Sequence, residues 1–198
     1  MKFFLTLWCV LPLLAWARVG PDLSAGVDVE FFTKLRRDYA KAPGTKFFPT
    51  WDLDPDHQNL VDAYRKRDVD EVLKLADSWL KKCPVDAETH LRVAMCFKEK
   101  GDLPSYTYHL GVFYGLLQSL TSSGDGLTPQ TAFVVISVAE EYALLREIGA
   151  KVERQSLLAE GPCDRMDVSR AQGRVKSTYY FNVAIPFEAT KKALGGKE

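Results

Sequence analysis

The side chains best suited to chemistry in this chain are carboxylates in its second half. The set comprises Glu140, Glu141, Asp164 and Asp167, with Gln155 and Tyr142 as neutral polar neighbours in the sequence. Two carboxyl groups can divide the roles of general acid and general base when their surroundings separate their pKa values. The candidate catalytic residues are therefore Glu141 and Asp164, and the reaction they predict is acid–base hydrolysis.

Each of these carboxylates also has a structural interpretation. Ser137 and Glu140 have the spacing of a capping box, in which the third helical residue binds back to the N-cap backbone. Glu141 then lies in the first turn of the same helix, where the helix dipole favours a negative charge. Asp164 and Asp167 are separated by an odd number of positions in a predicted strand, so they point to opposite faces and cannot share one proton or metal. These assignments favour structural over catalytic roles.

Other chemical motifs are missing from the sequence. It contains no glycine-rich phosphate loop, nucleophile elbow or metalloprotease helix. His57, His90 and His109 do not combine with the cysteines in the spacing of metal ligands. We therefore expect no metal and no cofactor. Tyr180 is a candidate ligand-binding residue, because alternation along its strand directs its ring away from the core, where it could stack on a sugar or peptide.

Residues 1–17 have the three-part pattern of a secretory signal peptide. Lys2 precedes an apolar run that starts at Phe3, and the small-x-small exit is Ala15-Trp16-Ala17. The run is shorter than the roughly 20 residues needed to cross a membrane. We expect cleavage after Ala17, export to the periplasm or the extracellular space, and no integral membrane segment after processing.

The balance of basic and acidic residues argues against one class of partner for the exported chain. Lys2 is the single charged side chain of the leader, so the remainder has 25 basic and 26 acidic residues. This balance gives no electrostatic reason to bind nucleic acid. The cysteines that remain are Cys83, Cys96 and Cys163. On successive antiparallel helices, Cys96 would lie roughly 12 Å beyond the residue that faces Cys83, too far for a disulfide. Whether any of the three forms a disulfide stays open.

A repeated signal indicates paired helices in the first half. Arg67-Asp68-Val69 recurs as Gly101-Asp102-Leu103, and each triplet ends one predicted helix and starts another. This period of about 34 residues resembles the helix hairpins of tetratricopeptide repeats, over positions 53–120. Two unrelated hairpins of matching length are the alternative. Stacked hairpins of this kind offer a concave surface to another protein or peptide.

The last helix of this layer carries a ridge of small residues. Between Pro104 and Leu120 the small side chains step by four, at positions Thr107, Gly111, Gly115 and Ser119. Such a ridge lets a neighbouring element approach the helix backbone closely, or it forms the floor of a groove. Gly111 and Gly115 are therefore candidate ligand-binding positions, with packing as the competing interpretation.

After the predicted turn at 121–126, the residue pattern is no longer that of paired helices. We expect a strand over 132–136, a helix over 138–148 that ends at Gly149, strands over 152–159, 163–171 and 174–185, and a short tail after Pro186. A single helix beginning at Pro129 is the alternative to the first strand. The predicted class is α+β, with antiparallel helix hairpins packed on a mainly antiparallel sheet. The expected parts are a signal peptide (1–17), a flexible lead (18–27), a helical layer (28–126) and a sheet region with one helix (127–198), the last two forming one continuous domain.

Six short motifs resemble the bacterial secreted proteins grouped as domain of unknown function 4919. They are Gly124-Asp125-Gly126, Val135-Ile136-Ser137-Val138, Glu140-Glu141-Tyr142, Gln155-Ser156-Leu157, Cys163-Asp164 and Tyr180-Phe181-Asn182-Val183. The resemblance covers positions 28–194. It implies an exported bacterial protein and supplies no catalytic residues.

Two functional hypotheses follow from the sequence. The first is an exported, non-enzymatic binding or scaffolding module that uses its helix-hairpin surface to hold another envelope protein or peptide. The alternative is an envelope hydrolase or small-ligand binder, with a pocket between helices and sheet around Glu141, Asp164 and Tyr180.

Overall fold

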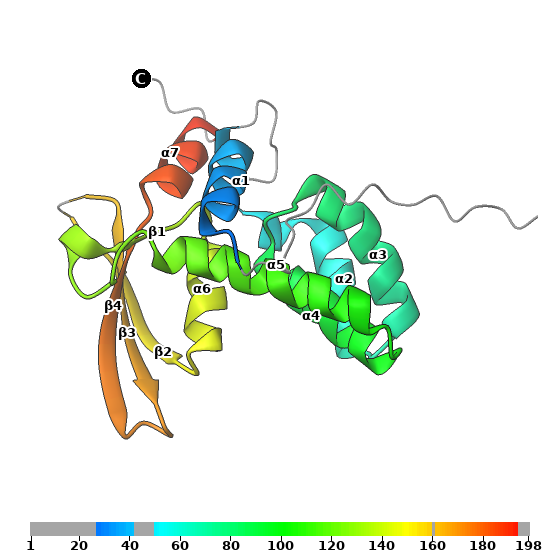
Figure 1. Ribbon diagram of the computed structural model, residues 1–198. Coiled ribbons are helices and arrows are strands. Elements are labelled where there is room, and N and C mark those ends of the chain that lie inside the picture. The colour runs from blue at the N-terminus through cyan, green and yellow to red at the C-terminus, as the bar shows by residue number, and fades with distance from the viewer. Residues whose placement is uncertain (1–26, 42–49, 160, 194–198) are drawn as a thin grey trace, which may run out of the picture.

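The computed structural model describes residues 27–41, 50–159 and 161–193 (Figure 1). Its helices are α1 (Val29–Lys41), α2 (Pro55–Arg65), α3 (Val69–Lys82), α4 (Ala87–Glu99), α5 (Leu103–Thr121), α6 (Val138–Glu147) and α7 (Ala184–Ala193). Its strands are β1 (Phe133–Val134), β2 (Lys151–Leu157), β3 (Cys163–Arg170) and β4 (Val175–Asn182). Short 3₁₀ turns cover Trp51–Leu53 and Pro129–Thr131. The predicted α+β class is confirmed.

The turns within the two helix hairpins, α2–α3 and α4–α5, are structurally equivalent. Arg67 and Gly101 both adopt the left-handed conformation, with φ of 59° and 73°. A left-handed residue at this position ends a helix, so α2 and α4 end in the same way. Asp68 and Asp102 then cap α3 and α5, each accepting a hydrogen bond of 3.1 Å from a backbone N–H in the first helical turn. The repeated triplet is thus a repeat in structure, while the likeness to tetratricopeptide repeats stays a prediction.

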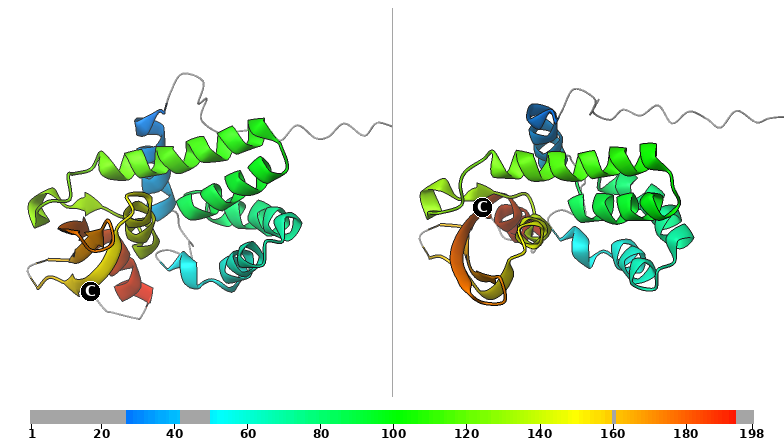
Figure 2. Two further views of the ribbon diagram at one scale, coloured as in Figure 1. Left: turned by 90° about the horizontal axis from the view of Figure 1, so that it is seen from below. Right: turned by 60° about the horizontal axis from the view of Figure 1, so that its bottom comes forward.

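Close contact between α1 and α5 depends on the small-residue ridge. In Figure 2, α1 crosses the long α5. A Cβ atom added at Gly115 would lie 2.1 Å from the Phe32 ring, so the ring occupies the space that any larger residue would need. One turn further along α5, Ser119 Oγ lies 2.8 Å from Thr33 Oγ1. The ridge therefore seats α1 on α5.

The four strands form one mixed sheet in the order β1-β4-β3-β2. β1 pairs with β4 in parallel, and the other neighbours pair antiparallel. Met166 and Phe181 are fully buried on the inner face, while Tyr180 and Thr178 take the opposite face, as the alternation predicted. α6 lies between this sheet and the helical layer (Figure 1). A single core cluster runs through both parts, from Trp79 to Phe181.

The secondary structure predicted for the C-terminal end of the chain is wrong. The last strand was expected to reach Ile185 and to be followed by a tail, but β4 ends at Asn182 and α7 begins at Ala184. The Asn182 side-chain oxygen accepts a 3.0 Å hydrogen bond from the Ala184 N–H, and the Val183 carbonyl accepts one of 2.9 Å from the Phe187 N–H, so the helix follows the strand directly. Pro186 does not stop this helix, since it lies in the first turn, where no intrahelical N–H donor is needed.

Other boundaries agree with the expectations. A short strand precedes α6, and only a 3₁₀ turn forms at Pro129, so the single helix from Pro129 is excluded. Gly149 follows α6 with φ of 65°. The predicted signal peptide and residues 18–26 of the lead lie outside the described residues. None of the helices in the described ranges is long and apolar enough to cross a membrane.

The Gly115 contact predicts a packing defect. Gly115→Ala should lower the free energy of unfolding by about 1–3 kcal/mol, because the new methyl group overlaps the Phe32 ring. Chemical denaturation measures this change. In the double variant with Phe32→Leu the two costs should be less than additive, since the smaller side chain makes room. Simple additivity of the two costs would contradict the proposed contact.

Candidate functional site

The structure brings Glu141 and Asp164 close enough to interact electrostatically. Glu141 lies in the first turn of α6, where its side chain is fully buried. Asp164, near the start of β3, is 7% exposed and accepts a 2.6 Å hydrogen bond from the Gln155 side-chain amide. The Gln155 carbonyl in turn accepts one of 2.8 Å from the Tyr142 hydroxyl. Tyr142, Gln155 and Asp164 thus form a hydrogen-bonded chain, and the buried acid Glu141 interacts electrostatically with its two ends.

Burial dominates the electrostatics of Glu141. Removal from water disfavours its ionised form, and the neighbouring charges of Asp164 and Glu140 add to the effect, which raises the Glu141 pKa from 4.5 to about 9. Its two carboxyl oxygens are buried and make no hydrogen bond to any described residue. Glu141 is therefore a protonated, neutral acid at neutral pH.

The burial of Glu141 limits the chemistry that Glu141 and Asp164 can perform on a ligand. Tyr142 is 37% exposed and marks the outer end of the chain, whereas Glu141 has no exposed surface. A catalytic acid must come within hydrogen-bond distance of its substrate. Glu141 is fully buried, so proton transfer from its carboxyl group to a ligand requires the site to open.

Glu140 has a different partner from the one the capping box predicts. Ser137 does accept from the Glu140 N–H, at 3.4 Å, but the Glu140 carboxylate binds the Ile136 N–H and the guanidinium of Arg36 instead. Two hydrogen bonds of 2.7 Å join Glu140 to Arg36, and both residues are 4% exposed. Arg36 also donates to the Val134 carbonyl, at 2.9 Å.

Sequence reasoning missed Arg36 as a partner of Glu140. The available signal was its position one helical turn after Phe32, which places a cation on the face of α1 that buries this ring. A buried cation needs an anionic partner. That partner is 104 residues away along the chain, and no local pattern identifies it.

A second buried polar cluster joins the helix hairpins. Asp86, the N-cap of α4, accepts from Trp79 Nε1 at 2.8 Å and from the Thr89 hydroxyl at 2.6 Å, and it lies 3.2 Å from His57 Nε2. Although burial opposes ionisation, these contacts together lower the Asp86 pKa to about 2. The cluster holds α2, α3 and α4 together.

The described residues contain no metal centre and no disulfide. Among them, no group of three or more His, Cys, Asp or Glu side chains could hold a metal ion. Cys83, Cys96 and Cys163 are buried free thiols. His90 and His109 face each other across 3.0 Å between their Nδ1 atoms, and burial lowers the His90 pKa to about 4.

The remaining candidate residues do not join the carboxyl pair. Strand register places Asp164 opposite Phe181 and Tyr180 opposite Arg165, so Tyr180 lies on the other face of the sheet from Asp164. Asp167 is on that other face too, where it accepts from Arg165 and Thr178. Gly111 is half-buried on α5, and Phe32 covers Gly115.

Glu141 makes stability depend on pH in a predictable direction. Between pH 4.5 and about 9 the folded protein retains a proton that the unfolded chain releases, so its free energy of unfolding falls as pH rises. The slope from one such group is about 1.4 kcal/mol per pH unit. Glu141→Gln removes this dependence. Its stability relative to wild type should therefore increase from pH 5 to pH 8 in denaturation experiments.

Glu99→Gln is the matched control, because it makes the same substitution at an exposed position of α4. Its stability relative to wild type should not change over this pH range. If Glu141→Gln behaves like the control, Glu141 is not a buried neutral acid.

Comparison with known proteins identifies the family and supplies no activity. Searches of curated proteins and of solved structures found no significant match. The family described as "Domain of unknown function (DUF4919)" matches residues 50–192, which include Glu141, the Tyr142–Gln155–Asp164 chain and most of the fold. The match covers well over half of the 198 residues, and the chain belongs to this family.

Proposed function

We propose that the protein is an exported, non-enzymatic binding module whose helix-hairpin surface holds another envelope protein or a peptide. The observation that carries this proposal is the equivalence of the turns and caps that join α2 to α3 and α4 to α5. Helix pairs that repeat in this way stack into surfaces suited to extended partners. The pattern of residues 1–17 supports export, with cleavage after Ala17.

The proposed binding surface is the side formed by α2 and α4. The contact between His57 and Asp86 holds the first turn of α2 against the start of α4. Tyr64 is 36% exposed on α2 and supplies an aromatic ring of the kind enriched in interfaces. On α4, Glu88 accepts from Arg92 at 2.9 Å and also pairs with Arg146 of α6. The surface therefore combines an aromatic ring with a partly buried charge network.

One observation favours the alternative of a hydrolase or small-ligand binder. Glu141 is buried beside Asp164 without a hydrogen-bond partner among the described residues, and strongly shifted carboxyls of this kind concentrate at functional sites. The alternative requires Glu141→Gln to abolish an activity while the fold persists. The complete burial of Glu141 places this function second.

Site-specific photo-crosslinking tests the binding surface. A photoreactive phenylalanine at Tyr64 should crosslink one envelope protein in intact cells, while the same residue at Tyr114 on α5 should not. The two tyrosines form a matched pair, since they are 36% and 40% exposed. The intact mass of the crosslinked chain should also show that residues 1–17 are absent. Equal crosslinking at both positions, or none at Tyr64, would contradict the proposal.

A further inference from the structure

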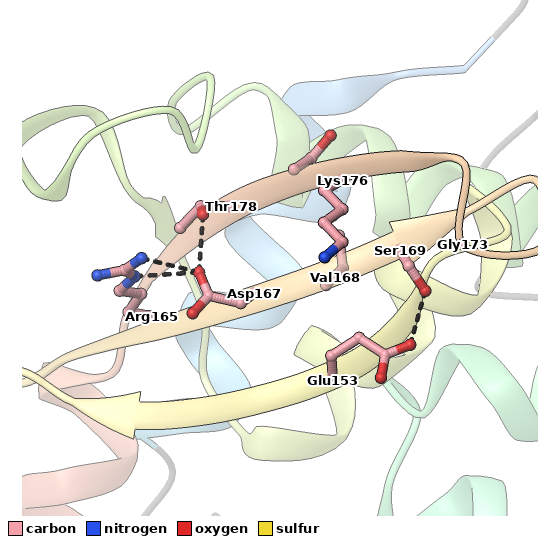
Figure 3. Close-up of a pocket in the computed structure, with 9 residues that line it drawn as sticks. Glu153, Arg165, Asp167, Val168, Ser169, Gly173, Lys176 and Thr178 are labelled. Atoms are coloured by element: carbon pink, nitrogen blue, oxygen red, sulfur yellow. Dashed lines mark hydrogen bonds and ion pairs between the residues drawn. The ribbon is translucent and has the colours of Figure 1, made fainter.

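The outer face of the sheet contains a hollow lined mainly by polar residues. It is separate from the proposed α2–α4 binding surface. It has a volume of about 780 Å³, within the range of ligand sites. β2, β3 and β4 all contribute to it (Figure 3). A second hollow of about 410 Å³ adjoins it toward the β3–β4 turn, and the two share Glu153, Ser169 and Gly173. Together they form a groove along the sheet.

The groove is positively charged in a chain whose formal net charge is zero. The cationic side chains on this face are Lys151, Arg165 and Lys176, and the anionic ones are Glu153 and Asp167. This gives an excess of one positive charge at one place. Such an excess attracts ligands that carry negative charge.

The acidic residues are already neutralised by neighbours within the groove. Asp167 accepts from Arg165 Nε and Nη2 at 3.1 and 3.0 Å and from the Thr178 hydroxyl at 2.8 Å, so the pKa of Asp167 is lowered. Glu153 accepts from the Ser169 hydroxyl at 2.7 Å and lies 3.4 Å from the Lys151 ammonium group. These contacts fix the floor of the groove before any ligand arrives.

One cationic group in the groove keeps unused hydrogen-bonding capacity. Lys176 extends from β4 over β3, between Asp167 and Ser169 in Figure 3. Its ammonium group forms no ion pair with an acidic residue of the described chain, although its charge helps to lower the Glu153 pKa. Arg170 is on the other face of the sheet, where it donates at 3.5 Å to the hydroxyl of Ser177, the cross-strand partner of the core residue Val168. Carboxylate oxygens are strong acceptors for an ammonium group.

Tyr180 lies beside this groove. It is the direct cross-strand partner of Arg165, so its half-exposed ring lies on the same face of the sheet. A tyrosine ring can stack on the apolar face of a sugar, while its hydroxyl stays in water. The groove face thus carries an aromatic ring, two hydroxyl groups and one ammonium group without an ion pair.

We propose that this groove binds an acidic oligosaccharide, a sugar chain that carries carboxylate groups. Lys176 contacts a carboxylate, Thr178 and Ser169 contact sugar hydroxyls, and Tyr180 stacks on a ring. The site is separate from the α2–α4 surface, and either proposal can fail without the other.

Titration calorimetry with the full mature chain tests the proposal. The probes are tri-galacturonic acid, the neutral trisaccharide maltotriose, and poly-glutamate as a polyanion without sugar rings. We expect binding of tri-galacturonic acid alone. Lys176→Gln should weaken that binding about tenfold at low salt, since it removes an unpaired charge from the site. Tyr180→Leu should weaken it as well.

Lys191→Gln on α7 is the matched control and should leave the affinity unchanged, because Lys191 is exposed and lies outside the groove. Equal binding of maltotriose would exclude the charge-based recognition. Equal binding of poly-glutamate, or indifference to the Tyr180 substitution, would show general attraction of anions and contradict the proposed ligand class. Absence of binding to tri-galacturonic acid would overturn the proposal.

Discussion

The buried ion pair between Arg36 and Glu140 is the interaction on which the arrangement of the two halves depends. Arg36 belongs to the first helix and Glu140 to the helix beside the sheet, and two hydrogen bonds of 2.7 Å join them. Arg36 also donates to Ser119 on α5, at 3.1 Å, and to the carbonyl of Val134 in β1. One guanidinium group thus connects α1, α5, β1 and α6. Because removing either partner leaves an uncompensated charge in the core, the elements must assemble together.

Within the described part of the chain, Glu141, the next residue along the helix, is buried without a partner of this kind. Glu140 is paired with a cation, whereas Glu141 is buried beside Asp164 without a hydrogen-bond partner among the described residues and is kept protonated. Two adjacent glutamates in one helix turn therefore differ in charge at neutral pH. The first stabilises the fold, and the second is a cost that rises with pH. That cost makes Glu141 the main reason to keep a ligand-binding or catalytic function under consideration.

Local patterns in the sequence were sufficient to predict most helices and strands. They did not predict the contacts between them. Asp68 and Asp102 marked the helix turns because capping is a property of a few consecutive residues, and alternation along β4 separated Phe181 from Tyr180 correctly. The Arg36–Glu140 pair was missed because its partners meet only through tertiary folding. α7 was missed because Pro186 was interpreted as a stop, although proline is tolerated in a first helical turn. The polar groove arises from three strands and a turn, and no single segment shows it.

The most direct test of this account is a double-mutant cycle of Arg36→Met and Glu140→Leu, measured by chemical denaturation. Each single substitution should lower the free energy of unfolding by about 3–5 kcal/mol, because it strands one buried charge or its donors. The double variant should lose markedly less than the two costs together, with a coupling of about 2 kcal/mol. If the two costs add within about 0.5 kcal/mol, the ion pair does not hold the helical layer and the sheet together.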